Sequence, residues 1–168
     1  MADQQDQTQI ESNQLTRDLI QTSVWQSAQT VALTVSGGIE VNTRPLMQAA
    51  ITAGKTVLLP KTMPHRQMAF LPFNGDDKQL VVSTFGIPEP VFDATLVNQA
   101  PDLVVVPAIA FDVSTRQRIG FGAGYYDRFL ATYKGQTVAM VPSVMRYETA
   151  QWPLEEHDVP IHKLITLR

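Results

Sequence analysis

The fold of this chain is decided by the run LVVVP at residues 103–107, its most continuous apolar stretch. A strand in which every residue is apolar is typical of a parallel sheet that helices cover on both faces. Loops and helix starts gather at the carboxyl ends of such strands, and ligands bind there. We therefore predict a central strand at residues 103–107 and a ligand site in the segment that follows it.

A β-α-β unit precedes this strand. The runs TVALTV at residues 30–35 and TVLLP at residues 56–60 are short, apolar and β-branched, which predicts two strands. Between them Thr43 should cap a helix that has Pro45 in its first turn and Gly54 just past its end. Strands joined by such a helix are parallel to each other.

The remaining elements fit around this unit. Helices are expected over residues 9–29 and 125–133, and a last strand over residues 137–141. Apolar stretches at residues 68–73 and 80–85 flank a polar turn, so they should form a hairpin or meander beside the main sheet, and the prolines of residues 86–90 predict a loop. The fold class we expect is α/β: a single three-layer α/β/α domain over residues 1–168, with a largely parallel sheet and a small antiparallel extension.

Composition narrows the function classes. Hydrophobic residues make up 44% and charged residues 17%, as in a folded globular chain, and 13 Lys plus Arg against 16 Asp plus Glu argue against a nucleic-acid partner. The absence of cysteine excludes disulfides, cysteine zinc sites and thiol nucleophiles. No run approaches the ~20 apolar residues of a membrane helix, and residues 1–12 lack the pattern of an export signal. We expect a cytoplasmic monomer or weak dimer with small-molecule substrates and no membrane or nucleic-acid partner.

The segment best suited to chemistry is RIGFGAGYYDR at residues 118–128. Its alternating glycines let backbone N–H groups approach a phosphate, and a helix that begins beyond them adds its dipole. The spacing matches neither the dinucleotide fingerprint nor the Walker loop, so plain turns remain an alternative. Asp127 could hold Mg²⁺ beside nucleotide phosphates, or merely favour the helix dipole. Tyr125 and Tyr126 could stack on a flat heterocycle or serve packing alone.

The longer stretch VVVPAIAFDVSTRQRIGFGAGYYDRFL, residues 104–130, resembles the signature of the 5-formyltetrahydrofolate cyclo-ligase family. That pattern runs from a strand through Pro and Phe-Asp to Arg and Gly-x-Gly-x-Gly-Tyr-Tyr-Asp. Four other segments also resemble the family: EVNTRPL, KTVLLPK, FGIPEP and EEHDVPIHKLIT. The resemblance extends from about Ser12 to the C-terminus.

The resemblance implies that ATP and Mg²⁺ are used to turn 5-formyltetrahydrofolate into 5,10-methenyltetrahydrofolate through a phosphorylated formyl group. It implies ATP contacts at Arg118, Ile119, Gly120, Phe121, Gly122, Ala123, Gly124, Tyr125 and Tyr126. It implies folate contacts at Val35, Glu40, Gly122, Tyr125 and Tyr126, Mg²⁺ ligands at Asp127 and Asp158, and catalytic roles for Tyr126 and Asp127. On its own, Glu40 could instead be a solvated loop carboxylate, and Asp158 could just as easily be part of a solvated turn.

Two departures from the family leave alternatives open. The family begins with a basic helix of Lys-x-x-x-Arg type, whereas residues 1–11 hold no Lys or Arg. An upstream start, a shortened chain or lost activity would each account for this, and the intact run at residues 120–127 favours the first. Phe121 and Ala123 stand where relatives often carry a basic residue, so phosphate contacts should depend more on backbone N–H groups.

The competing functions are a non-catalytic folate-binding relative and, from fold analogy alone, a sugar-phosphate isomerase or CoA-transferase-like enzyme.

Overall fold

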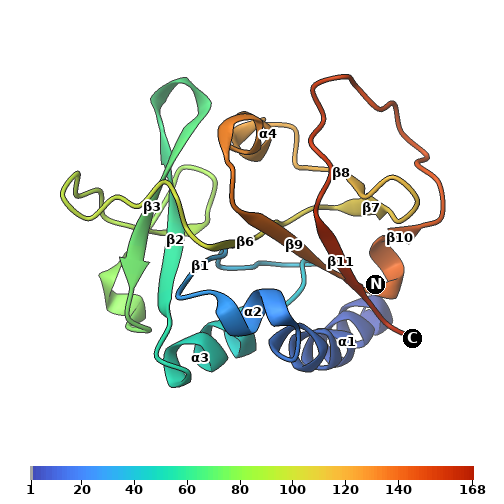
Figure 1. Ribbon diagram of the computed structural model, residues 1–168, viewed down its shortest axis with the longest axis horizontal. Helices are drawn as coiled ribbons and strands as arrows, with labels where there is room; N and C mark the ends of the chain where they lie inside the picture. The colour runs from blue at the N-terminus through green and yellow to red at the C-terminus, as the bar shows by residue number, and fades with distance from the viewer. Residues whose placement is uncertain (1) are drawn as a thin grey trace.

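The computed structural model describes residues 2–168 and, from Asp6 onward, their side chains. Its main feature is a six-stranded sheet with the order β11-β9-β6-β1-β2-β3 (Figure 1). These strands are β11 (Lys163–Thr166), β9 (Gln136–Val141), β6 (Leu103–Val105), β1 (Thr30–Ala32), β2 (Thr56–Met63) and β3 (Gln67–Phe73). All neighbours are parallel except β2 and β3, which are antiparallel. The predicted sheet, with β6 inside it and an antiparallel extension, is confirmed.

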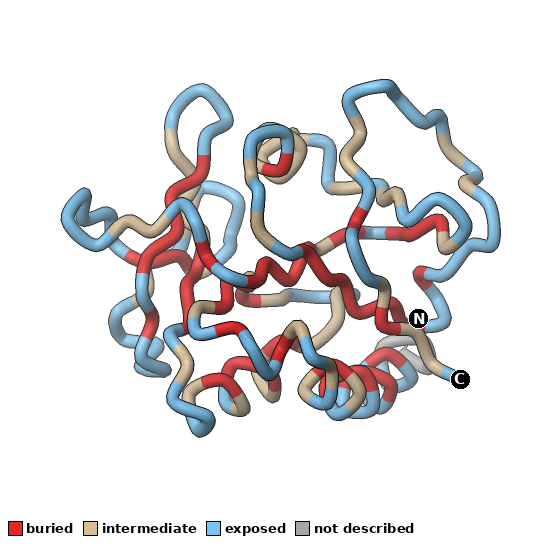
Figure 2. The backbone as a smooth tube through the Cα atoms, viewed as in Figure 1, coloured by how far each residue is buried: buried red, intermediate tan, exposed pale blue. Residues whose placement is uncertain are grey.

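Helices cover both faces of this sheet (Figure 1). One face carries α1 (Ala2–Ile20), α2 (Ser23–Ser27) and α3 (Arg44–Thr52), and the other carries α4 (Tyr125–Thr132). Leu103 belongs to the same hydrophobic core as Leu15 and Leu46, whereas its neighbour Val104 belongs to the core that contains Leu130 of α4. Successive residues of a strand point to opposite faces, so β6 is apolar throughout because it serves two cores. Figure 2 shows the buried residues following the sheet between its two helical layers.

Two small sheets flank the main one. The first has the order β10-β7-β8, and the second pairs β4 with β5. Their strands are β10 (Arg146–Tyr147), β7 (Ala110–Asp112), β8 (Gln117–Ile119), β4 (Leu80–Val82) and β5 (Pro88–Pro90). Short 3₁₀ turns occur at η1 (Pro64–Arg66), η2 (Asp77–Gln79) and η3 (Ser143–Met145). Among the described residues, no helix combines the length and apolarity that a membrane crossing requires.

The predicted hairpin between residues 68–73 and 80–85 is wrong. The β3 strand instead pairs with β2 around the turn η1, and β4 pairs with β5, so residues 88–90 form a strand where a loop was expected. Prolines are compatible with this strand because it belongs to a two-stranded sheet and needs few N–H donors. Glu89 holds it against β2, where its buried carboxylate accepts a hydrogen bond from Thr62 at 2.9 Å and contacts Lys61 at 3.2 Å.

The helix predicted at residues 9–29 is in fact two helices. The break follows from Thr22, whose hydroxyl accepts a hydrogen bond from the Trp25 backbone and so caps α2. The predicted helix with Pro45 near its start is confirmed as α3. Thr43 occupies the N-cap position, but its side chain does not cap the helix and is used elsewhere.

We predict that Asp112→Asn will lower the free energy of unfolding by about 2–3 kcal/mol at neutral pH, because buried donors would lose a charged acceptor. The buried Asp112 carboxylate accepts hydrogen bonds from the Ser114 backbone and hydroxyl, the Thr115 backbone and the Ala150 backbone. Burial raises the pKa of Asp112, but these bonds outweigh it and lower the pKa to about 2. Urea unfolding of both proteins measures the difference.

The stabilisation by Asp112 should be fully present above its ordinary pKa of about 3.9 and fade as the pH falls toward 2. The difference between wild type and Asp112→Asn should therefore shrink across that window. Asp93 is a matched control, since it makes a similar contact with Thr95 but is exposed. Equal effects of Asp93→Asn and Asp112→Asn would contradict the prediction.

Candidate functional site

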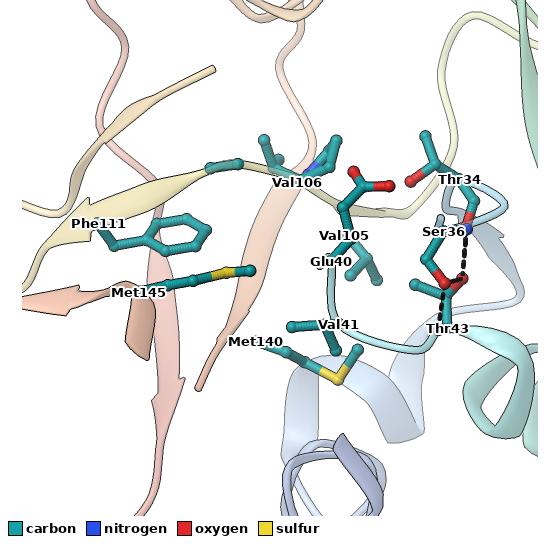
Figure 3. A pocket seen from close by; sticks show the side chains of 12 residues that line it. Thr34, Ser36, Glu40, Val41, Thr43, Val105, Val106, Phe111, Met140 and Met145 are labelled. Carbon is teal, nitrogen blue, oxygen red and sulfur yellow. Dashed lines mark hydrogen bonds between the residues drawn. The ribbon is translucent and has the colours of Figure 1, made fainter. Parts of the chain in front are cut away.

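A cavity of about 30 Å³ lies at the carboxyl ends of β1 and β6 (Figure 3). This is the edge of the sheet at which the sequence predicted a ligand. The lining residues come from the segment after β1, from the end of β6 and the segment after it, and from β7, β9 and η3: Thr34, Ser36, Glu40, Val41, Thr43, Val105, Val106, Pro107, Ala108, Phe111, Met140 and Met145. The wall is mostly apolar, with a few polar groups that could orient a ligand.

Glu40 is the carboxylate of this cavity. It accepts a hydrogen bond from the Gly37 backbone N–H at 2.8 Å, and in Figure 3 its carboxylate points toward Thr34. Burial raises the pKa of Glu40, and the bond from Gly37 offsets only part of that rise. A carboxylate in this position can accept hydrogen bonds from a ligand with N–H donors.

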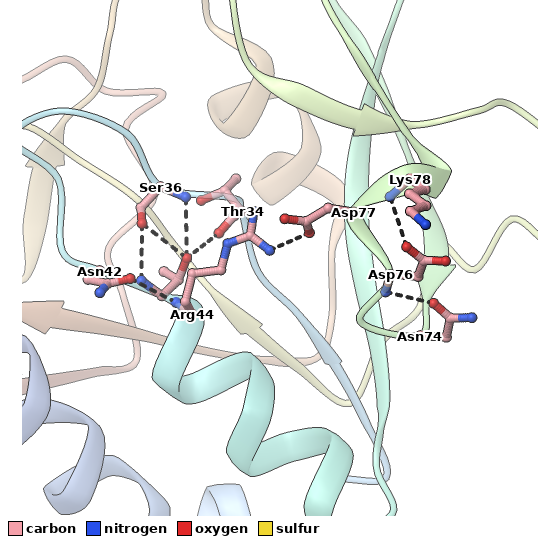
Figure 4. Close-up of polar contacts among 9 residues, drawn as sticks. Thr34, Ser36, Asn42, Arg44, Asn74, Asp76, Asp77 and Lys78 are labelled. Atoms are coloured by element: carbon pink, nitrogen blue, oxygen red, sulfur yellow. Dashed lines mark hydrogen bonds and ion pairs between the residues drawn. The ribbon is translucent and has the colours of Figure 1, made fainter.

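The loop that carries Glu40 is fixed by hydroxyl groups (Figure 4). The Thr43 hydroxyl donates to the Thr34 carbonyl at 2.6 Å and accepts from the Ser36 N–H at 3.3 Å. The Ser36 hydroxyl in turn accepts from the Thr43 N–H at 3.1 Å. Figure 4 also shows Arg44 in an ion pair with Asp77 at 2.6 Å, which ties the start of α3 to the segment before β4.

The helix α1 holds two walls of the cavity from beneath. Its buried Ser12 accepts a hydrogen bond from the Asn42 N–H at 3.1 Å, next to Glu40's loop. Its buried Glu11 accepts bonds from the Ser143 N–H at 2.7 Å and the Ser143 hydroxyl at 2.9 Å, at the start of η3. Burial raises the pKa of Glu11, but the bonds from Gln7 and Ser143 together lower it below its ordinary value.

Arg118 lies beneath residues 119–124, IGFGAG, which we call the glycine run. Its side chain is 5% exposed, and it donates to the Asp127 carboxylate at 2.8 Å and to the Pro107 carbonyl at 3.2 Å. Its guanidinium carbon lies 5.6 Å from the centre of the Tyr126 ring. Burial lowers the pKa of Arg118, while the charges of Asp127, Tyr126 and Asp158 oppose that shift.

The glycines of the run serve two different purposes. Gly122 and Gly124 have φ angles of 88° and 78°, in the left-handed region that favours glycine, and Gly124 is the N-cap of α4. Gly120 has an ordinary φ, but a Cβ at this position would lie 2.7 Å from Arg118 Nη1. Gly120 therefore makes room for the buried guanidinium.

Tyr126 connects the glycine run with the cavity. Its hydroxyl is buried and has no hydrogen-bond partner of acceptable geometry. Burial raises the pKa of Tyr126 well above its ordinary value; Arg118 and the nearby Thr34 side chain oppose this rise, and the charge of Glu40 adds to it. A buried hydroxyl without a partner is costly, so a ligand that supplied a partner would be favoured here.

The structure brings together several of the residues that the sequence singled out. Arg118, Tyr126 and Asp127 are in contact, and the charges of Glu40 and Asp158 act on members of this group. Val35 is buried but is not in the cavity wall. The other predicted site residues of this segment lie around these groups: Ile119 and Phe121 are exposed, Ala123 is half-buried, and Tyr125 packs edge-on against Phe85 at 5.9 Å.

The two predicted metal ligands are not a preformed metal cage. Within residues 6–168, whose side chains the structure describes, no group of three or more His, Cys, Asp or Glu side chains could hold a metal ion. Asp127 contacts Arg118 through Oδ1 and is 40% exposed, and Asp158 accepts a bond from the Glu155 N–H at 2.8 Å. Such a pair fits Mg²⁺ only together with phosphate oxygens and water, which is the way proteins usually bind this ion.

Sequence reasoning missed Glu11 and Ser12 as residues that support the site, and Asp112 as the residue that holds the turn after β7. The signal for the first two was present, because Glu11 and Ser12 lie four and three residues before the apolar Leu15 and so share its buried stripe of α1. A polar residue at a buried helical position is informative, since it must find a partner. Asp112 gave no such signal, because three of its four donors lie two or three residues away in a turn and the fourth lies 38 residues away.

Gly120→Ala should displace the Arg118 side chain and lower the free energy of unfolding by about 1–3 kcal/mol, as is usual for overpacking. Gly37→Ala is the matched control, because a Cβ there would meet no atom within 4 Å and the backbone is not left-handed. That variant should be neutral or slightly stabilising. Thermal and urea unfolding measure both; equal stability of the two variants would refute this account of Gly120.

Residues 1–167 match the sequence model of the 5-formyltetrahydrofolate cyclo-ligase family. The chain is 34% identical over 146 residues to the 5-formyltetrahydrofolate cyclo-ligase of Escherichia coli (strain K12). The aligned region covers 83% of this chain and 78% of that protein. The chain is 30% identical over 150 residues to the Haemophilus influenzae enzyme of the same name, covering 82% of this chain and 75% of that one. The NMR structure of Aquifex aeolicus 5,10-methenyltetrahydrofolate synthetase superposes with a TM-score of 0.80 at 30% identity, over 96% of this chain and 80% of that chain. The chain therefore belongs to the 5-formyltetrahydrofolate cyclo-ligase family of enzymes.

Proposed function

We propose that this enzyme converts 5-formyltetrahydrofolate into 5,10-methenyltetrahydrofolate with consumption of ATP and a requirement for Mg²⁺. The observation that carries the proposal is the position of Tyr126. It lies in the first turn of α4, directly after the glycine run suited to phosphate, its ring contacts Arg118, and the Glu40 carboxylate of the cavity acts on its hydroxyl. A nucleotide at the run and a folate at the cavity would thus meet at one residue.

In the proposed reaction the formyl oxygen attacks the γ-phosphorus of ATP, so that an O–P bond forms and the bond to ADP breaks. N10 then attacks the activated formyl carbon and gives up its proton to solvent, and inorganic phosphate leaves with the formyl oxygen. The protein needs no covalent nucleophile for this sequence. Its task is to align the two reactants and to neutralise charge on the transferred group.

Three features of this chain would neutralise the negative charge of the phosphates. Backbone N–H groups of the glycine run and the start of α4 would donate to the phosphates, and Arg118 lies beside Gly120 of that run. Asp127 and Asp158 would hold Mg²⁺, because both carboxylates lie near Arg118 and two carboxylates with phosphate oxygens suit this ion. Mg²⁺ bound there would supply further neutralisation of phosphate charge.

The pterin ring of the folate would enter the cavity, where Glu40 can accept hydrogen bonds from its N–H and amino groups. A cavity of about 30 Å³ has room for only a couple of water molecules. Binding therefore requires the glycine run or the loop that carries Glu40 to move outward. The loop is held by the hydroxyl network around Thr43, whereas the run carries two exposed residues, Ile119 and Phe121. The run is the part that we expect to move.

The proposal is tested by following the absorbance of methenyltetrahydrofolate after the protein is mixed with 5-formyltetrahydrofolate, ATP and Mg²⁺. Omission of ATP or of Mg²⁺ should abolish product formation. Asp127→Asn, which keeps an oxygen acceptor for Arg118, should lower the rate at limiting Mg²⁺ by at least tenfold and recover partly as Mg²⁺ is raised. Product formation without ATP, or none with all three components, would refute the proposal.

Glu40→Gln should raise the KM for 5-formyltetrahydrofolate by roughly tenfold or more, since a charged acceptor is lost, and leave the KM for ATP unchanged. The raised pKa of Glu40 adds a pH signature. Only the carboxylate accepts bonds at both oxygens, so folate affinity should fall as the pH drops through that raised pKa. The ratio of KM values between variant and wild type should shrink at acid pH. A ratio that does not change with pH would show that Glu40 does not bind the folate as a carboxylate.

A further inference from the structure

The tip of the β2–β3 hairpin has an unusual backbone. His65 has φ 59° and ψ 31°, and Arg66 has φ 58°, so two successive residues are left-handed. Hairpin turns with this geometry favour Asn and Gly, because other residues are strained by roughly 1–2 kcal/mol each. Strained residues of this kind are often found where a side chain has to be presented to a ligand.

The strained tip directs Arg66 toward the glycine run. Its Nη1 atom lies 3.9 Å from the position that a Cβ on Gly124 would occupy. Gly124 is the N-cap of α4, so this guanidinium lies beside the first turn of that helix. Figure 1 shows the hairpin tip and α4 on the same side of the sheet, and β3 contacts α4. The sequence separates these two positions by 58 residues, and the fold brings them together.

The Arg66 guanidinium has no carboxylate partner. Three other arginines, Arg44, Arg118 and Arg146, each form an ion pair, whereas Arg66 forms no ion pair or hydrogen bond among the described residues. It is also exposed, so its charge is available to a ligand. A long cationic side chain that lies beside a helix N-terminus without a partner is suited to an anion.

The glycine run needs such a cation. Residues 119–127 contain no Lys or Arg, and Arg118 is buried against Asp127. A second observation points to a ligand at the same run: the Arg118 side chain, which lies against Gly120, is 5% exposed, and its Nε is buried without a hydrogen-bond partner among the described residues. Arg118 approaches the run from beneath, and Arg66 approaches its end at Gly124.

We infer that Arg66 binds the terminal phosphates of the nucleotide at the glycine run. This inference rests on the proposed function and assigns to that site a cation from outside the run. A guanidinium can donate two parallel hydrogen bonds to phosphate oxygens, which fixes their direction as well as their charge. The hairpin tip and the glycine run then hold the triphosphate between them.

The test uses Arg66→Asn and Arg66→Lys. Asparagine tolerates the left-handed backbone, so the first variant should remove the charge without lowering the melting temperature. It should weaken ATP binding by roughly tenfold to a hundredfold and raise the KM for ATP, with the KM for 5-formyltetrahydrofolate unchanged. Arg66→Lys should recover part of this loss. Arg17→Gln on α1 is the control, because Arg17 contacts Gln14 and α1 covers the opposite face of the sheet.

Calorimetric titration with ATP and steady-state kinetics are both required, because together they separate the two hypotheses. If the wild-type protein is active and Arg66→Asn binds ATP with unchanged affinity, the role of Arg66 is overturned and the proposed function is left intact. Wild type that forms product without ATP would overturn the proposed function, and the titration would still decide whether Arg66 binds the nucleotide. An equal rise in both KM values would also overturn the inference, since it would indicate a general disturbance of the site.

Discussion

The parallel pairing of β6 with β1 and β9 is the constraint on which the site depends. Val31 lies opposite Leu103, and Leu103 lies opposite Gln136, so the three strands run in one direction and end at one edge of the sheet. The segments that leave this edge carry Glu40, the glycine run and η3. Such strands require apolar residues on both faces, which leaves polar chemistry to the segments beyond their ends.

Polar groups on α1 then fix how these segments stand relative to one another. Glu11 and Ser12 are neighbours on one helix, yet they bond to Ser143 and Asn42, which lie about a hundred residues apart. Both are buried, so neither bond is easily replaced by water. Apolar packing alone would allow small shifts of η3 and of the Glu40 loop, whereas directional hydrogen bonds define their positions.

Sequence reasoning found those parts of the molecule whose signal is local. The apolar run of β6, the helix α3 with its proline and the start of α4 were all predicted from neighbouring residues. The β2–β3 pairing was missed because its turn, Pro64–Arg66, lacks the Asn or Gly that marks such turns. Arg66 itself could not be assigned to the site, since its approach to Gly124 depends on how hairpin and helix pack in three dimensions. The glycine run was recognised from the sequence, but the reason for a glycine at position 120 was not. That reason is the space that the Arg118 side chain occupies, and it depends on the three-dimensional path of this side chain.

Arg118 explains why the two halves of the site cannot be treated separately. Its guanidinium contacts the Pro107 carbonyl beyond β6, the Asp127 carboxylate on α4 and the ring of Tyr126. A buried arginine is stable only while such partners are in place. A movement of any one partner therefore shifts the guanidinium and changes its contacts with the others. In the function that we propose, outward movement of the glycine run to admit a folate would shift the floor of the proposed phosphate site, and an anion beside Gly124 would in turn restrain the run. The cavity that holds Glu40 and the run that ends at Gly124 are thus two sides of one packed unit.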